Sequence, residues 1–419
     1  MQTELTLNGS NDPAARYLGW APVPAQLRLV DAGNANAAVD VTVRNRTSAG
    51  GGALVFATVP GAQPSAQLAL KLPPDSTPVD LVVSGLFPRA STGDRDTTVE
   101  VVDQAGTVLG STPVMVRIRK DATTLTTAER DRFVAAFAAF NNRGMGRFRD
   151  FRNVHTAAGD PEAHGRAGFL PWHRAFLLDL ERELQAIDAS VALPYWRFDR
   201  PARSLFTRDF MGVTSAATGT VQFNPANPLQ FWATDGVPGI ARRPQFDTRN
   251  AAASSPFGGR VIDEIATLRL GGAGGVYAGF RAMEGNPHGT AHVSFSGSIS
   301  SIPTAAKDPL FFLLHANVDR LWAKWQWANG RFSTADPRTF STDGDNPPRV
   351  GHRLGDTMWP WNGVTTPPRP STAPGGTLAP SPLTAAPGLQ PRVDDMVDYQ
   401  GVTNPAGRIG VDYDDVPFG

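Results

Sequence analysis

The sequence predicts an α+β protein with several domains, in which an N-terminal antiparallel β-sandwich precedes a mainly α-helical domain with long loops. Two periodicities support this fold class: apolar residues alternate before about residue 120 and recur at helical spacing after it. The length of 419 residues also favours more than one core. We expect a β-sandwich at 1–120, a helical domain at 121–335, and a proline- and glycine-rich segment at 336–419 that packs on the helical domain.

The N-terminal part shows short alternating runs between about Gln26 and Arg119. Valine or leucine occupies every second position of each run, and turn sequences such as SAGGG and LPPDSTP separate the runs. This pattern is typical of an antiparallel sandwich of roughly seven strands. No histidine occurs before residue 120, and no catalytic constellation is visible there. We therefore interpret this part as a packing or interaction module of undefined role.

The helical domain is expected to begin at Thr126, which forms a capping-box pattern with Glu129. Two further helices are strongly indicated, Pro171 to Ile187 and Pro309 to Trp327, because each carries an apolar face at helical spacing. The intervening residues 200–275 are rich in Gly, Pro, Asn and Ser. They predict long loops with one short helix near Val261 to Leu270.

The composition excludes several classes of function. Lys plus Arg and Asp plus Glu both number 39, so no bulk charge favours nucleic acid or an anionic membrane. The absence of cysteine excludes disulfides, thiolate metal sites and a thiol nucleophile. No run of 18 apolar residues occurs, and the first residues lack the pattern of a signal peptide. We therefore expect a cytoplasmic protein, although export with a partner protein stays open, and the oligomeric state is left undefined.

Six of the seven histidines fall into two clusters of three. A single buried histidine is usually only hydrogen-bonded to the backbone, but two such triplets are hard to explain in that way. Each triplet ends in a histidine on an apolar helix, where an unsatisfied imidazole would be costly. We therefore predict two metal ions, each with three imidazole ligands, and all-imidazole sites favour copper or zinc. The clusters are His155, His164 and His173, and His288, His292 and His315.

Two stretches resemble the signatures of a known family, the type 3 copper proteins, and in particular its bacterial tyrosinase and polyphenol oxidase (catechol oxidase) branch. FLPWHRAFLLDLERELQAIDASVALPYW (Phe169 to Trp196) resembles the first copper signature, and DPLFFLLHANVDRLWAKWQ (Asp308 to Gln326) the second. The resemblance implies a four-helix bundle that holds two copper ions, the first on the upstream triplet and the second on the downstream one. It also implies dioxygen as co-substrate, a small phenolic substrate, and oxidation of o-diphenols to o-quinones, with monophenol hydroxylation open.

Four further residues correspond to substrate-pocket positions of the family. Glu284 matches a glutamate that is thought to hold a water together with an asparagine, but Gly289 stands where monophenol-active relatives have that asparagine. The resemblance therefore favours catechol oxidation over monophenol hydroxylation. Val293 and Ile302 align with positions beside a copper ligand and at the pocket gate. Since both are apolar, we expect a phenol ring to fit without strong recognition of a carboxylate at Val293.

The sequence departs from the family pattern in two further ways, and three alternative functions compete with the leading one. Leu314 replaces a histidine common in relatives, and the lack of cysteine precludes the thioether crosslink of plant and fungal members. RIGVDYDD near the C-terminus resembles the tyrosine motif that closes the family's core domain, with Tyr413 retained. The alternatives are an o-aminophenol oxidase, a haemocyanin-like oxygen carrier, and a dizinc hydrolase. The last is disfavoured because no carboxylate completes either cluster.

Overall fold

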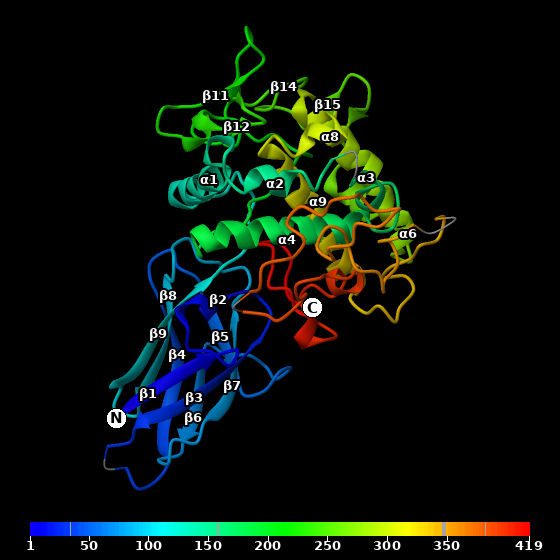
Figure 1. The fold of residues 1–419 in the computed structure, drawn as a ribbon. Coiled ribbons are helices and arrows are strands. Elements are labelled where there is room, and N and C mark those ends of the chain that lie inside the picture. Colours follow the sequence, from blue (N-terminus) through cyan, green and yellow to red (C-terminus); the bar gives the residue numbers. More distant parts are fainter. Residues whose placement is uncertain (34, 157–158, 346–348, 382) are drawn as a thin grey trace. The chain divides into compact units, whose positions relative to one another are not determined.

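The computed structural model describes residues 1–33, 35–156, 159–345, 349–381 and 383–419, and its fold is a mixture of α and β structure (Figure 1). These residues form two compact units. The first comprises Met1–Ile118, Ser381–Ala385 and Gly410–Phe418, and the second comprises Arg119–Pro380 and Ala386–Ile409, together with Gly419.

The first unit contains two sheets that contribute to one apolar core. Buried and exposed residues alternate along β3, which buries every second residue from Val23 to Leu29. One face of this strand therefore points into the apolar core. The strands pair antiparallel, except that β2 runs parallel to β9. In order, the sheets are β1 (Gln2–Leu7), β3 (Val23–Asp31), β7 (Val79–Gly85) and β5 (Leu54–Ala57), and β2 (Tyr17–Leu18), β9 (Val108–Val116), β8 (Thr97–Asp103), β4 (Val39–Thr47) and β6 (Gln67–Leu72).

Two differences from the predicted domain organisation are visible. The described strands number nine rather than seven, because β1 and β2 lie before the alternating region that starts at Gln26. The predicted C-terminal segment 336–419 is also divided between the units instead of packing wholly with the helices. Asp412 Oδ2 accepts the Trp20 backbone N–H at 2.9 Å, and the Tyr413 carbonyl accepts the Trp20 indole N–H at 2.9 Å. These bonds tie the motif that contains Tyr413 to the first unit.

The second unit is built around three long helices, α1 (Thr127–Asn141), α4 (Phe169–Ile187) and α9 (Leu310–Asn329). The structure confirms the capping box at the start of α1, where Thr126 and Glu129 cap each other. Helix α9 ends at Gly330, whose φ of 62° suits glycine. The shorter helices are α2 (Phe148–Arg152), α3 (Asp160–Ala163), α5 (Glu264–Leu268), α6 (Tyr277–Phe280), α7 (Thr290–His292) and α8 (Ile302–Ala305).

The segment before α7, from which His288 comes, is not a regular α-helix. It consists of a 3₁₀ turn, η4 (Arg281–Glu284), and a π-helical turn, η5 (Gly285–Gly289), in which Asn286 has φ −138° and ψ 120°. The residue before a proline is disfavoured in the helical region, and Pro287 follows Asn286 directly. His288 and His292 therefore come from an irregular turn and a short helix.

The loop region 200–275 contains short strand pairs as well as the expected short helix, which is α5. A further pair joins this region to residues beyond α7. The pairs are β10 (Val213–Thr214) with β11 (Val221–Gln222), β12 (Ala233–Thr234) with β13 (Val237–Pro238), β15 (Ser254–Ser255) with β16 (Gly259–Arg260), and β14 (Arg242–Pro244) with β17 (Phe295–Gly297).

Buried ion pairs join α4 to α9. Arg174 Nε lies 2.5 Å from Asp319 Oδ1, and Arg119 contacts both Asp319 and Glu181 at 3.2 and 2.9 Å. All four side chains are almost fully buried. Within the described residues, no helix has the length and apolar character needed to cross a membrane.

Candidate metal centre

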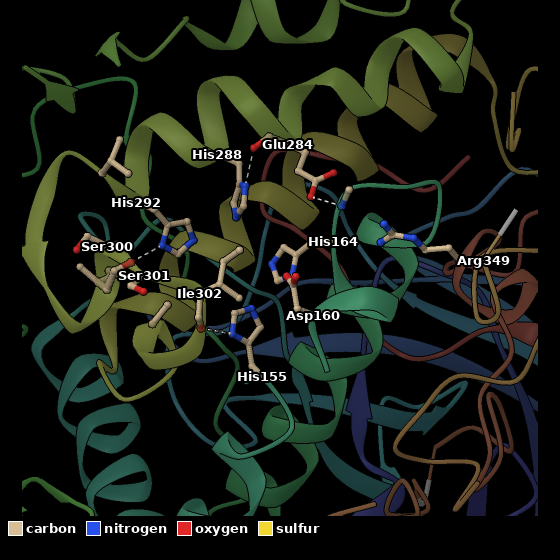
Figure 2. A pocket seen from close by; sticks show the side chains of 15 residues that line it. His155, Asp160, His164, Glu284, His288, His292, Ser300, Ser301, Ile302 and Arg349 are labelled. Carbon is tan, nitrogen blue, oxygen red and sulfur yellow. Dashed lines mark hydrogen bonds and ion pairs between the residues drawn. The ribbon is translucent and has the colours of Figure 1, made fainter. Parts of the chain in front are cut away.

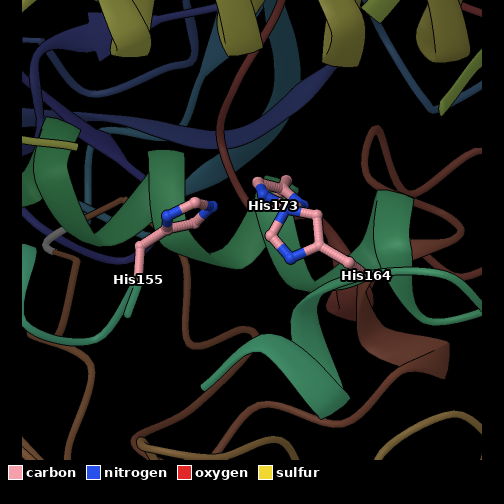
Figure 3. Close-up of side chains that lie close together, drawn as sticks. All are labelled: His155, His164 and His173. Atoms are coloured by element: carbon pink, nitrogen blue, oxygen red, sulfur yellow. The ribbon is translucent and has the colours of Figure 1, made fainter. Parts of the chain in front are cut away.

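The structure brings the six clustered histidines into two groups of three. In each group, one nitrogen from every imidazole lies within 4.8 Å of the others. Figure 3 shows the imidazoles of His155, His164 and His173 converging from different segments. The second group is His288, His292 and His315. Segments separated by more than 100 residues therefore supply one candidate centre, as the sequence clusters predicted.

The local structure of each histidine differs between the groups. His173 and His315 lie within the long helices α4 and α9, whose apolar faces fix them in the core. His155 follows α2, and His164 ends the one-turn helix α3. His288 and His292 come from η5 and α7.

The Nδ1 atoms of most of these rings face hydrogen-bond acceptors outside the centre. A ring that donates from Nδ1 presents the lone pair of Nε2, which is the arrangement a metal ligand needs. His315 Nδ1 has no hydrogen-bond partner in the described part of the chain. The other contacts are His155 to Ile302 O at 3.2 Å, His173 to Phe169 O at 2.8 Å, His288 to Glu284 O at 2.7 Å, His292 to Ile299 O at 2.7 Å, and His164 to Asp160 Oδ1 at 3.0 Å.

The Nε2 atoms point inward. His155 Nε2 and His173 Nε2 are buried without any hydrogen-bond partner among the described residues. In the other group, His315 Nε2 lies 3.0 Å from His292 Nε2 and 3.2 Å from His288 Nε2. Converging lone pairs in a buried space repel each other unless a cation lies between them. The donor set therefore fits one metal ion for each group.

Burial keeps these ligands neutral. It lowers the pKa of His155, His173, His288 and His315 well below the ordinary histidine value, and the charges of neighbouring imidazoles lower it further. The same desolvation lowers the pKa of His292 to about 4. These five imidazoles are therefore unprotonated at neutral pH, as metal ligation requires.

The two groups face each other across stacked rings. The ring centroids of His173 and His315 are 4.3 Å apart, with an angle of 12° between the planes. His155 lies 6.2 Å from His315, and His173 lies 6.4 Å from His288. The two groups thus belong to one dinuclear centre rather than to separate sites.

Aromatic side chains surround part of this centre. Phe169 packs against His173 and His288 at centroid distances of 4.7 and 4.8 Å, and Phe311 lies 4.2 Å from His315. Trp172 also contacts His173. By contrast, the ring contacts of Phe312 include α1 and α2 aromatics and no clustered histidine, and Leu313 is buried and binds Trp196 N–H through its carbonyl. Phe312 and Leu313 therefore belong to the helical core.

A pocket of about 550 Å³ opens onto four of the six histidines (Figure 2). All four pocket residues predicted from the sequence line it, namely Glu284, Gly289, Val293 and Ile302. Its other lining residues include several that the sequence reasoning missed. These are Asp160, Gly165, Ile299, Ser300, Ser301, Ala305 and Arg349.

Asp160 and Glu284 both contact the segment that holds His164. Asp160 precedes His164 by four residues, a spacing that could have revealed the pairing, and hydrogen bonding to His164 lowers the pKa of Asp160. Glu284 Oε1 accepts the Gly165 backbone N–H at 2.6 Å, while burial raises the pKa of Glu284. Arg349 had no comparable signal, because it lies far along the chain in a segment without periodicity.

The seventh histidine, His352, supports the centre without joining it. Its Nδ1 accepts the Gly168 N–H at 2.8 Å, at the start of α4. Its Nε2 lies 2.9 Å from the Pro161 carbonyl and donates to it. His352 therefore joins α3 to the N-terminal end of α4, on either side of His164.

The chain is similar to several known proteins. Residues 145–328 match the family model described as the common central domain of tyrosinase. A tyrosinase of Streptomyces antibioticus is 33% identical over 277 residues, which cover 59% of this chain and 94% of that protein. A tyrosinase of Streptomyces glaucescens is 36% identical over 268 residues, covering 58% and 92%. A solved functional unit of octopus hemocyanin aligns with a TM-score of 0.43 and 19% identity over 72% of this chain and 69% of its own.

Proposed function

The chain belongs to the tyrosinase family of type 3 copper proteins, and on that premise we propose that it oxidises o-diphenols to o-quinones with dioxygen. The family is dicopper, and the two buried triads of neutral imidazoles fit two copper ions. The observation that carries the proposal is the inward convergence of the Nε2 atoms from two facing triads.

His155, His164 and His173 would hold one copper, and His288, His292 and His315 the other. When bound, the copper pair supplies the electron transfer between the phenol and dioxygen. The histidines hold the ions without adding negative charge, and burial secures the neutral form of His155, His173, His288 and His315. Phe169 and Phe311 exclude water from the inner side of the centre.

We propose that the second unit is a tyrosinase-type four-helix bundle. Helices α1, α4 and α9 would supply three of its members, and the broken segment from Tyr277 to His292 would supply the fourth. The first unit would be a β-sandwich module whose two sheets share one core. Only the second unit contains the clustered histidines, which supports its assignment as the catalytic domain.

The pocket supports a small, neutral phenolic substrate. Val293 and Ile302 offer apolar contacts to a ring that approaches His292. Glu284 remains beside the pocket, but Gly289 provides no amide to hold a water with it. A monophenol must lose its proton before it can be oxygenated, whereas a diphenol does not need an oxygen atom added to its ring. We therefore propose that diphenol oxidation exceeds monophenol hydroxylation.

The test is the stoichiometry of oxygen consumption by the copper-loaded protein. Two catechols lose four electrons and four protons to one dioxygen, which yields two o-quinones and two waters. A monophenol instead consumes one dioxygen for each o-quinone and water formed. Supplying catechol, tyramine and o-aminophenol separately should show one oxygen for every two catechols and slower consumption with tyramine.

The remaining alternatives are separated by the same assay. Turnover of o-aminophenol at a rate well above that of catechol would identify an o-aminophenol oxidase. Binding of two copper ions without turnover of any of the three substrates would contradict the proposed oxidase and favour an oxygen carrier. Failure to bind copper would contradict the dicopper assignment itself.

A further inference from the structure

His164 is held differently from the other clustered histidines. Among those six, it alone has an Nδ1 that faces a side-chain carboxylate, 3.0 Å from Asp160 Oδ1. Both atoms are buried, and within the described chain neither has a hydrogen bond of regular geometry, so the contact between them is a close approach of two polar atoms. The backbone of His164 is extended, with φ −137° and ψ 162°, at the end of a helix of a single turn. Its own backbone is therefore a weak support compared with the long helices that carry His173 and His315.

The residue after His164 is fixed from the opposite side. Gly165 has a φ of +74°, a conformation that favours glycine, and its N–H donates to Glu284 Oε1 at 2.6 Å. Figure 2 shows His164 between Asp160 and Glu284. The backbone carbonyl of Glu284 also accepts from His288 Nδ1 at 2.7 Å. Glu284 therefore touches the supports of a histidine from each triad.

We propose that Asp160 and Glu284 are positioning residues that hold His164 from two sides and so set the copper affinity of its triad. This inference rests on the proposed function. Asp160 orients the ring by presenting an accepting oxygen to Nδ1, which favours the tautomer whose Nε2 lone pair faces the metal. Glu284 fixes the backbone that follows, and through its own carbonyl it couples this loop to the triad that contains His288.

Two kinds of substitution distinguish the role of the accepting oxygen from the role of the negative charge. Asp160→Ala and Glu284→Ala remove the accepting oxygen, whereas Asp160→Asn and Glu284→Gln keep one and remove the charge. Asp131→Asn in α1 is a matched control, since its side chain is 58% exposed and pairs only with neighbouring Arg130 among the described contacts. Each full-length protein is titrated with Cu(I) against a competing chelator, and amide exchange of residues 159–168 is followed without metal.

The alanine variants should bind one of two copper ions about 10- to 100-fold more weakly, with the other unchanged. Their Gly165 amide should exchange faster, and the amide variants should recover most of both properties. Copper affinities equal to wild type in the alanine variants would overturn the proposal. So would amide variants as weak as the alanine ones, because an accepting oxygen would then be irrelevant.

The copper titration and the amide exchange distinguish failure of the proposed function from failure of the support of His164. Wild-type protein that binds fewer than two copper ions contradicts the proposed function. In that case the rate of amide exchange at Gly165, measured without metal, still tests whether Asp160 and Glu284 hold the segment that contains His164. Should Asp160→Ala not fold, Asp160→Ser replaces it, because the shorter side chain cannot reach His164 Nδ1. Unchanged exchange of residues 159–168 in Glu284→Ala contradicts the support whatever the copper titration shows.

Discussion

Gly289 lines the pocket directly after His288, where a side chain would change the balance of reactions. We expect Gly289→Asn to raise the ratio of monophenol to diphenol oxidation several-fold, because an amide beside Glu284 can help to hold a water that accepts the phenol proton. A Cβ at this position would lie 3.2 Å from the Glu284 carbonyl oxygen, so a shift of a few tenths of an ångström is enough to admit it. Initial rates with tyramine and catechol measure the ratio.

Gly285→Asn is the control for that substitution. Gly285 belongs to the same π-helical turn, but a Cβ there would meet no atom within 4 Å, and the residue does not line the pocket. It should leave the ratio of the two rates unchanged. An unchanged ratio in Gly289→Asn as well would reject the role assigned to the missing amide.

Asp179 gives the second unit a pH-dependent stability. Burial raises its pKa to about 7, and the hydrogen bond from the Trp361 indole at 2.9 Å offsets only part of this effect. The folded protein therefore holds this proton more tightly than the unfolded chain, and stability falls as pH rises from about 4 to about 7. Asp179→Asn removes the titration while its amide oxygen can still accept from Trp361.

We compare the unfolding free energy of Asp179→Asn with that of wild type at pH 5 and at pH 8. The difference between variant and wild type should be about 2 to 3 kcal/mol more favourable to the variant at pH 8 than at pH 5. Chemical denaturation at both values gives this difference directly. A difference between Asp179→Asn and wild type that does not vary with pH would exclude a protonated Asp179 in the folded state.

At the level of elements, the ion pair between Arg174 and Asp319 joins the two helices that carry His173 and His315. Arg174→Ala should lower the free energy of unfolding by about 3 to 5 kcal/mol, because it leaves a buried carboxylate with fewer partners. The loss is measured by denaturant unfolding without metal. Arg149→Ala removes an exposed arginine from α2 and should cost less than 0.5 kcal/mol or so. Equal losses of unfolding free energy in the two variants would show that the buried ion pair contributes no more to stability than an exposed one.

The elements also show why sequence reasoning succeeded only in part. Helices α1, α4 and α9 were predictable because each has either a capping box or a long apolar face. The region around His288 was not, since Pro287 and two glycines replace regular hydrogen bonds by a π-helical turn. Strand β2 has two residues and is too short to show any alternation.

The metal centre was likewise predictable from the sequence only in part. The six histidines were identified from clustering, and the structure brings each triplet together. Glu284, Gly289, Val293 and Ile302 were placed by resemblance, and all line the pocket. Asp160 was overlooked although it lies one helical turn before His164, whereas Arg349 reaches the pocket only through tertiary folding. Contacts made by irregular chain segments leave no periodic trace in the sequence.

For the whole molecule, the chain returns to its first unit near the C-terminus. Asp412→Ala should destabilise this unit by about 1 to 3 kcal/mol, since the buried Trp20 N–H would lose its acceptor. Amide exchange of Trp20 and its neighbours measures the effect locally. Asp412→Asn retains an accepting oxygen and should recover most of the protection. Exchange at Trp20 that stays at the wild-type rate in Asp412→Ala would contradict the attachment of this segment.

The central claim is that two facing histidine triads form one dicopper oxidase centre. The most direct measurement is copper content per chain, determined together with catechol-dependent oxygen consumption, for wild type, His173→Ala and His315→Ala. The account predicts two copper ions in the wild type with one oxygen consumed for every two catechols. Each variant should retain one copper ion and lose catechol oxidation. Two copper ions and normal turnover in either variant, or a wild type that binds fewer than two, would contradict the account.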